Sequence, residues 1–190
     1  MTYLGINTPE LRFDNFTAKW DHRPLGELGS FKNGLNKDKA DFGFGVEFVN
    51  LMNVFGKSIL EDVKFDLVNA SQKEIDSYSL KSGDVLFIRS SVKRTGVGET
   101  SLIPKDLHNI VYSGFLIRFR ENSKTLDLNY KRYCFSIGSF RKKLLSLATT
   151  SANTNINQES LEKIVLSFPS LPEQQKIAAF LSAVDKKIQL

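Results

Sequence analysis

Apolar residues near the end of the chain recur at steps of four, three and four, which is the spacing of a coiled-coil seam. The stripe begins shortly after Ser170, and Pro172 suits the first turn of a helix because its missing N–H costs little there. So narrow a stripe needs a partner surface to cover it. We therefore predict a coiled-coil-type helix over 170–190 with a subunit interface formed by Ile177, Phe180, Leu181, Val184 and Ile188.

The pattern upstream of this helix mixes two periods, as expected of an α+β fold. Period-two alternation or short apolar runs predict strands over 46–52, 62–67, 81–89, 110–120 and 165–168. Spacing of three and four predicts one long helix over 129–148, and short helical turns are expected at 25–28 and 160–164. The stretch 149–155 is polar and predicts a linker. The expected architecture is a globular mixed-sheet domain over 1–169, followed by the terminal helix.

Charge is distributed unevenly along the chain. The net charge is only +5, yet residues 85–148 hold twelve Lys and Arg against four Asp and Glu. A basic middle between mildly acidic ends favours one cationic surface suited to a polyanion such as DNA. The alternative is that these charges simply keep the surface solvated.

Composition argues against several classes of protein. Hydrophobic residues make up 41% and charged residues 25%, which is ordinary for a globular domain. No signal-peptide pattern and no transmembrane stretch are visible, so we expect a cytoplasmic protein without membrane contact. One cysteine, Cys134, allows no internal disulfide, and with two histidines it leaves no metal framework. We find no cofactor motif and no catalytic constellation.

One weak catalytic alternative comes from three charged residues near the second predicted strand. Asp62, Lys64 and Asp66 match the short end of a nuclease metal site, and paired carboxylates could hold Mg²⁺. The tripeptide is common by chance, and the charges fall on the outer face of an alternating strand. A solvated strand face is the preferred interpretation, and we assign no metal ligand.

Candidates for DNA contact are better grouped. Their residue types can hold phosphates as charges or read base edges as hydrogen-bonding forks. Three segments contribute: a turn-rich loop, a glycine-flanked basic loop and a polar stretch. The predicted DNA-binding residues are Lys32, Asn33, Arg89, Lys93, Arg94, Thr95, Asn153, Thr154 and Asn155.

Four motifs together resemble a known family. The segment 164–188, with Leu-Pro-Glu-Gln-Gln-Lys-Ile-Ala at its centre, is similar to the junction in type I restriction–modification specificity subunits where a target recognition domain meets a conserved helix. Leu25-Gly-Glu-Leu28 resembles the entry into that domain, and Gly83-Asp-Val-Leu-Phe-Ile-Arg89 its Gly-Asp strand. Asn155-Ile-Asn157 matches the asparagine that precedes its closing helix.

The resemblance implies two recognition domains joined by antiparallel helices, each reading half of a split double-stranded DNA target through the major groove. It implies no catalysis in this subunit. Methylation and cleavage would belong to methyltransferase (M) and restriction (R) partner subunits, which would carry S-adenosylmethionine and ATP. This chain has the length of a half subunit, with a recognition domain at 1–169 and the start of a spacer helix at 170–190.

Two further points follow from this expectation. The terminal helix also offers a route to a homodimer that would read a symmetric split site. A rival hypothesis from another class is a protein-interaction module whose basic face is incidental.

Overall fold

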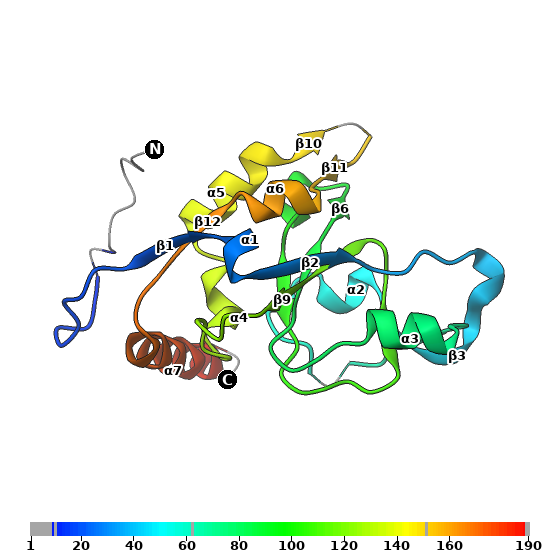
Figure 1. The fold of residues 1–190 in the computed structure, drawn as a ribbon, viewed down its shortest axis with the longest axis horizontal. Helices are drawn as coiled ribbons and strands as arrows, with labels where there is room; N and C mark the ends of the chain where they lie inside the picture. Colours follow the sequence, from blue (N-terminus) through cyan, green and yellow to red (C-terminus); the bar gives the residue numbers. More distant parts are fainter. Residues whose placement is uncertain (1–8, 10, 62, 151, 189–190) are drawn as a thin grey trace.

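A four-stranded antiparallel sheet lies at the centre of the molecule (Figure 1), in the spatial order β2-β9-β5-β7. Its strands are β2 (Gly29–Asn33), β5 (Val85–Ile88), β7 (Thr100–Leu102) and β9 (Leu116–Glu121). The computed structural model describes residues 9, 11–61, 63–150 and 152–188.

The central sheet is buried on both faces. Phe87 and Ile117 point into one core, whereas Leu86 and Leu116 point into another. All four side chains are fully buried. Because successive residues of a strand face opposite sides, this arrangement requires apolar side chains at almost every position, as the run Val85–Ile88 provides.

Helices cover the first core. They are α1 (Leu25–Leu28), α4 (Lys131–Cys134), α5 (Gly138–Leu147) and α6 (Gln158–Glu162). Beside them, β1 (Asp21–Pro24) pairs with β12 (Val165–Phe168) in an antiparallel ribbon. The ring of Phe135 fills the centre of this core, with its centroid 5.2 Å from that of Phe87 and 5.9 Å from that of Phe119.

The second core connects the sheet to a lobe at one end of the molecule (Figure 1). The lobe contains a mixed sheet, β4-β3-β8, in which β3 is antiparallel to β4 and parallel to β8. Its elements are η1 (Lys39–Asp41), β3 (Phe42–Val49), α2 (Leu51–Val54), β4 (Asp66–Val68), α3 (Gln72–Tyr78) and β8 (Ile110–Tyr112).

A third small sheet, β10-β11-β6, joins two segments that are distant in sequence. Its strands are β6 (Ser90–Ser91), β10 (Thr149–Thr150) and β11 (Thr154–Asn155), and η2 (Arg94–Gly96) follows β6. The expected linker over 149–155 is therefore largely paired strand, because its backbone bonds to β6 as well as to itself.

Several other predicted elements are confirmed. Gly29 follows α1 directly, β5 lies within the predicted 81–89 strand, and β12 is present. Asn157 caps α6, since its side-chain oxygen accepts a hydrogen bond from the Ser160 N–H at 2.9 Å.

The prediction of one long helix over 129–148 is wrong. Two helices form instead, and the chain is extended at Ile137 (φ −60°, ψ 135°) before α5 begins at Gly138. The break allows Phe135 to enter the core between the sheet and Phe140, which a continuous helix pattern does not reveal. The 110–120 strand likewise divides into β8 and β9, and the 62–67 strand is confined to Asp66–Val68 within the described residues.

The terminal helix α7 (Leu171–Ile188) is confirmed, and its attachment to the domain uses an unexpected face. Its buried residues are Glu173, Gln174 and Ala178, none of which belongs to the predicted seam. Further along, the Tyr133 hydroxyl lies 2.9 Å from the Ser182 hydroxyl and donates to Asp185 at 3.0 Å.

The predicted seam is only partly directed away from the domain, because Ile177 packs against the first core. Ile177, Leu181 and Val184 are half-buried, whereas Phe180 is 56% exposed and Ile188 is 77% exposed. An N-terminal segment covers part of it, because the ring of Phe13 packs edge-on against Phe180 at 6.0 Å. In the part of the chain that is described, no helix has the length and apolarity that a bilayer crossing requires.

Candidate nucleic-acid interface

Three strands of the central sheet end or begin at the same side of the sheet, and several of the candidate side chains lie there. Asn33 at the end of β2 is opposite Ile117, and Ile88 at the end of β5 is opposite Leu116. The turn that precedes β9 therefore lies beside the residues that follow β2 and β5. We call this group the strand-end site, formed by Asn33, Asn36, Arg89, Phe115 and Asn155.

Arg89 occupies the middle of the strand-end site. Its backbone N–H donates to the carbonyl of Phe115 at 2.8 Å, and its own carbonyl accepts from the Ile156 N–H at 3.0 Å. One terminal nitrogen of its guanidinium donates to the carbonyl of Gly114 at 3.2 Å. The side chain is half-exposed, and its remaining N–H groups bond to no other described residue. This orientation leaves a guanidinium edge available to an external acceptor.

Pairing of β11 with β6 adds Asn155 to the site. Asn155 is opposite Ser90, the residue after Arg89, and its side-chain amide donates to the carbonyl of Asn153 at 2.9 Å. Asn153 is exposed and Asn155 half-exposed. Thr154 is only 4% exposed, so its side chain is turned into the protein rather than toward a ligand.

The basic loop after β6 is exposed but braced. Lys93, Arg94 and Thr95 are all exposed. Arg94 donates to the carbonyl of Leu145 in α5 at 3.2 Å, and the carbonyl of Thr95 accepts from Arg141 at 2.7 Å. Lys93 forms no ion pair with another residue in the described ranges. The structure thus places a free cation next to the strand-end site.

Glycine allows this loop to return to the sheet. Gly98 has φ +68°, a left-handed conformation that L side chains rarely adopt. A Cβ atom there would lie 2.4 Å from the Leu144 side chain, so the close approach of the loop to α5 also requires glycine.

Lys32 is not part of the strand-end site, although its neighbour Asn33 is. Adjacent strand residues face opposite sides of a sheet, and Lys32 points toward α3. Its ammonium donates to the carbonyl and hydroxyl of Ser77 at 3.0 and 2.5 Å and lies 4.6 Å from the centre of the Tyr78 ring. Burial and the positive charges of Arg118 and Arg120 lower the pKa of Lys32.

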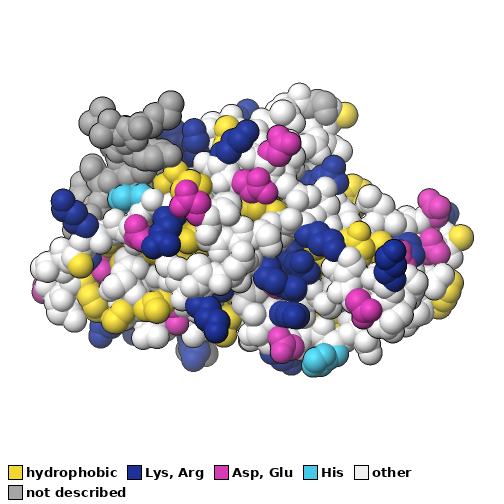
Figure 2. All heavy atoms as spheres, in the orientation of Figure 1, with side chains coloured by type: hydrophobic (Ala, Val, Ile, Leu, Met, Phe, Trp, Pro, Cys, Tyr) yellow, Lys and Arg dark blue, Asp and Glu magenta, His cyan; other side chains and the backbone are white. Residues whose placement is uncertain are grey.

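These cations bind the C-terminal end of α3. Arg118 and Arg120 donate to the carbonyl of Ser79 at 2.9 and 3.1 Å, where the helix dipole favours positive charge. Figure 2 shows Lys and Arg side chains gathered between β2 and α3. Lys32 therefore has a structural role that its sequence context did not indicate.

The expectation of one cationic surface for the basic middle is wrong for several of its members. Lys131 pairs with Glu121 at 2.7 Å, Arg120 with Asp84 at 2.6 Å, and Arg132 with Asp185 at 2.9 Å. These charges are used inside the protein. Sequence counts cannot separate them from exposed charges, because the pairing is between distant segments.

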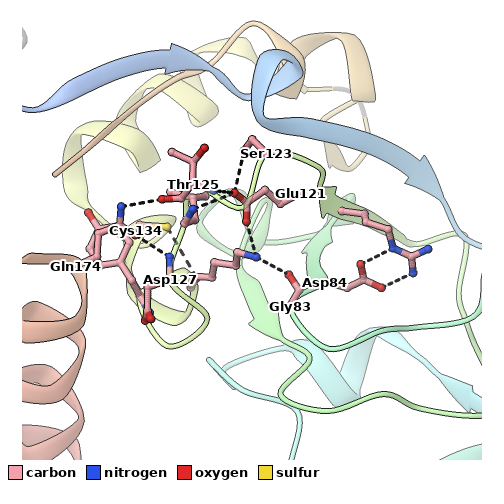
Figure 3. Close-up of polar contacts among 12 residues, drawn as sticks. Gly83, Asp84, Glu121, Ser123, Thr125, Asp127, Cys134 and Gln174 are labelled. Atoms are coloured by element: carbon pink, nitrogen blue, oxygen red, sulfur yellow. Dashed lines mark hydrogen bonds and ion pairs between the residues drawn. The ribbon is translucent and has the colours of Figure 1, made fainter. Parts of the chain in front are cut away.

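The buried ion pair between Lys131 and Glu121 belongs to a polar network next to α7 (Figure 3). Glu121 accepts from Lys131, from Ser123 and from the backbone N–H groups of Thr125 and Leu126. Gln174 of α7 accepts from the Asp127 N–H at 2.8 Å and donates to the carbonyls of Thr125 and Pro169 at 3.0 and 2.8 Å. We call this network the α7 joint, formed by Glu121, Thr125, Asp127, Lys131 and Gln174.

The nuclease alternative gains no structural support. Asp62 lies outside the described residues. The Asp66 carboxylate accepts a hydrogen bond from the Asn50 amide, and the carbonyl of Lys64 accepts from Asn53 at 3.3 Å. Within the described ranges, no group of three or more His, Cys, Asp or Glu side chains could hold a metal ion.

Sequence reasoning missed Asn36 and Phe115. Asn36 is exposed, and its amide oxygen lies against the α-carbon of Gly114. The alternating pattern assigned Phe115 to the same face as Ile117 and Phe119, yet the turn starts at Ser113 and carries Phe115 outward. The Ser113-Gly114 pair was the available signal for this turn.

Comparison with known proteins gives the family. A profile described as "Type I restriction modification DNA specificity domain" matches residues 17–190. The chain belongs to this family. The match confirms the family that the four motifs indicated, and it makes the chain a DNA specificity domain of a type I restriction–modification system.

Two curated relatives are similar along most of the chain. The Type I restriction enzyme EcoKI specificity subunit of Escherichia coli K12 is 27% identical over 85% of this specificity domain. The putative type I restriction enzyme MjaX specificity subunit of Methanocaldococcus jannaschii is 25% identical over 98% of it. The alignments cover 36% and 44% of those proteins, so this chain spans less than half the length of either.

Solved structures confirm the α+β fold. The S subunit from M. genitalium matches 96% of this specificity domain with a TM-score of 0.64 at 19% identity, covering 43% of that chain. The HsdS subunit from Thermoanaerobacter tengcongensis matches 98% with a TM-score of 0.64 at 20% identity, covering 40% of that chain. A chain from a study of complex assembly in the type I R-M system matches 98% with a TM-score of 0.67 at 19% identity, covering 41% of that chain.

Proposed function

We propose that this chain reads one half of a bipartite DNA target as the non-catalytic recognition part of a type I restriction–modification complex. One observation carries the proposal: in a chain of the specificity family, polar side chains from three distant segments converge at one sheet edge beside an exposed cationic loop. Methylation and cleavage then belong to the M and R subunits, together with S-adenosylmethionine and ATP.

Some of the candidate residues suit contacts with the DNA backbone, and others suit contacts with the bases. Lys93 and Arg94 suit phosphate oxygens, because such contacts need charge and little geometric detail. Arg89 presents N–H groups that match the two acceptors of a guanine edge, whereas Asn33 and Asn155 match an adenine edge. The bracing of Arg89 by Gly114 and Phe115 supports base readout, since direction matters more there than charge.

The test compares two exposed lysines in the full chain bound to the M subunit of its own system. A random duplex library first selects the preferred target. Affinity is then measured between about 50 and 200 mM salt. Lys93→Ala should weaken binding and reduce the slope of log affinity against log salt by about 1, because one phosphate contact is lost.

Lys19→Ala is the matched control. Lys19 is exposed and lies just before β1, which Figure 1 draws to the left of β6 and β11. It should leave the slope unchanged. Equal slopes for wild type and Lys93→Ala would remove Lys93 from the interface, and the absence of any sequence enrichment by the wild-type complex would refute the proposed function.

We further propose that residues 170–190 serve as the spacer that joins the recognition domain at 1–169 to a second helix. Support comes from the polar attachment face, which leaves Phe180 and Ile188 of the apolar seam exposed. A second copy of the chain can supply the matching seam. The two recognition domains of such a homodimer would then read a symmetric split target.

Sedimentation of the purified chain tests this assembly. Wild type should be dimeric at concentrations near 100 μM, and Phe180→Asp combined with Ile188→Asp should be monomeric with unchanged stability. The pair Gln175→Asp and Ala179→Asp adds the same charge at two exposed positions outside the seam. A monomeric wild type at every concentration would leave the M subunit, rather than a second copy, as the partner of the seam.

A further inference from the structure

Phe115 is an aromatic side chain exposed where its surroundings are buried. Every other residue from Ile110 to Phe119 is buried, whereas Phe115 is 60% exposed. A turn facing water is ordinarily polar. Phe115 therefore presents a large apolar ring to solvent at the strand-end site.

The ring is held on a fixed support. The N–H of Phe115 donates to the Ser113 hydroxyl at 3.2 Å, and the N–H of Leu116 donates to the Ser113 carbonyl at 2.9 Å. The N–H of Gly114 donates to the Leu35 carbonyl at 2.8 Å, which ties the turn to the segment after β2. These bonds anchor the backbone on both sides of the turn, so the direction of the Cα–Cβ bond of Phe115 is set before any ligand binds.

The neighbours of the ring identify the kind of ligand. The carbonyl of Phe115 accepts the N–H of Arg89, and the Arg89 guanidinium donates to the preceding carbonyl, that of Gly114, at 3.2 Å, so Phe115 and Arg89 belong to one local arrangement in the strand-end site. The amide oxygen of Asn36 lies close to Gly114 in the same turn. An apolar ring near hydrogen-bonding side chains suits a base edge on which an apolar group lies next to a hydrogen-bonding atom.

We propose that Phe115 is a specificity-determining residue that contacts the C5-methyl group of a thymine in the DNA target. Thymine is the base whose major-groove edge carries a methyl group, and apolar side chains contact that group in protein–DNA complexes. The inference rests on the proposed function and adds a base and a chemical group to it. It involves no charge, so its effect is separable from phosphate binding.

The experiment replaces single thymines of the selected half-target by deoxyuracil, which removes only the methyl group. For the wild-type chain with its M subunit, one such replacement should weaken binding about 4-fold, the effect expected of one methyl group leaving an apolar contact. Phe115→Ala should bind the thymine duplex at least about 4-fold more weakly than wild type does. It should no longer distinguish thymine from deoxyuracil at that position. Its salt slope should equal that of wild type.

Two further variants keep the test independent of folding. Phe115→Leu retains an apolar side chain and should restore most of the thymine preference. Phe44→Ala removes a phenylalanine that is 52% exposed in β3, outside the strand-end site, and should leave the preference intact.

Three results would overturn the inference. The first is equal discrimination between thymine and deoxyuracil by wild type and Phe115→Ala, and the second is unchanged wild-type binding with deoxyuracil at every position. The third is a rise in the fluorescence of a 2-aminopurine placed in the half-target, because it would show that the ring unstacks bases as a wedge. Binding of the wild-type complex to DNA without any sequence preference would overturn the proposed function together with this inference. The three results above would overturn the inference alone, so the two failures are distinguishable.

Discussion

The α7 joint and the strand-end site are both rich in polar side chains, and they use them in opposite ways. In the joint, the side chains of Lys131 and Glu121 are 9% and 4% exposed and form an ion pair, while all three hydrogen bonds of the Gln174 amide are made inside the protein. At the strand-end site, the Arg89 side chain makes one hydrogen bond within the described part of the chain, so its other N–H donors have no partner there.

The difference shows why exposure and pairing, rather than residue type, separate structure from recognition. A buried charge or amide that loses its partner cannot be rescued by water, so each member of the joint depends on the others. Side chains at the strand-end site are already solvated and can exchange water for a ligand. Changes in the joint should therefore act on stability, and changes at the strand-end site on binding.

The largest effect is expected from Lys131→Met. The substitution leaves the Glu121 carboxylate buried without its counter-charge, which typically costs about 3–5 kcal/mol of unfolding free energy. Urea unfolding at neutral pH measures it. Lys93→Met, at an exposed position, should change stability by less than about 0.5 kcal/mol. Similar losses for the two variants would erase the distinction between the two regions.

A smaller effect is expected from Gln174→Ala. The change leaves the Asp127 N–H without its acceptor and two carbonyls without their donor, at a cost of about 1–3 kcal/mol. Gln175→Ala alters the exposed neighbour and serves as the control. Hydrogen exchange should show faster exchange at the Asp127 amide in Gln174→Ala alone; protection equal to wild type would mean that α7 docks without this amide.

The smallest effect is expected on the pH dependence of stability, through the carboxyl group of Glu121. Burial alone would raise the pKa of Glu121, but the hydrogen bond from Lys131 and those from Leu126 and Ser123 outweigh it, and the net pKa is lowered. A carboxyl whose pKa is lower in the folded state stabilises the fold above its unfolded pKa near 4.5, and the contribution is lost as the pH falls further.

Melting temperatures at pH 7, 5, 4 and 3 test this sign. Wild type should lose more stability between pH 5 and 3 than Glu121→Gln, which has no carboxyl to protonate at this position. An acid dependence that is the same in the two proteins would show that Glu121 contributes nothing to it.

Particular residues show how far the sequence could predict this molecule. The start of α7, the Asn157 cap and the buried run of β5 follow from local patterns, and each is present. The division of the 129–148 segment could not be predicted, because the position that stops the helix is decided by Phe135 entering a core built from distant strands. The same limit applies to Phe115, which alternation places on one strand face with Ile117 and which the turn before β9 instead leaves exposed.

By itself, the sequence determined the family, the α+β class and the existence of an apolar seam on the terminal helix, since these depend on motifs and spacing within short windows. The tertiary structure alone decided which charges are used internally, which face of α7 meets the domain, and which side chains converge at one sheet edge. The physical reason is that pairing and burial arise from contacts between segments far apart in the chain, and no local pattern records them.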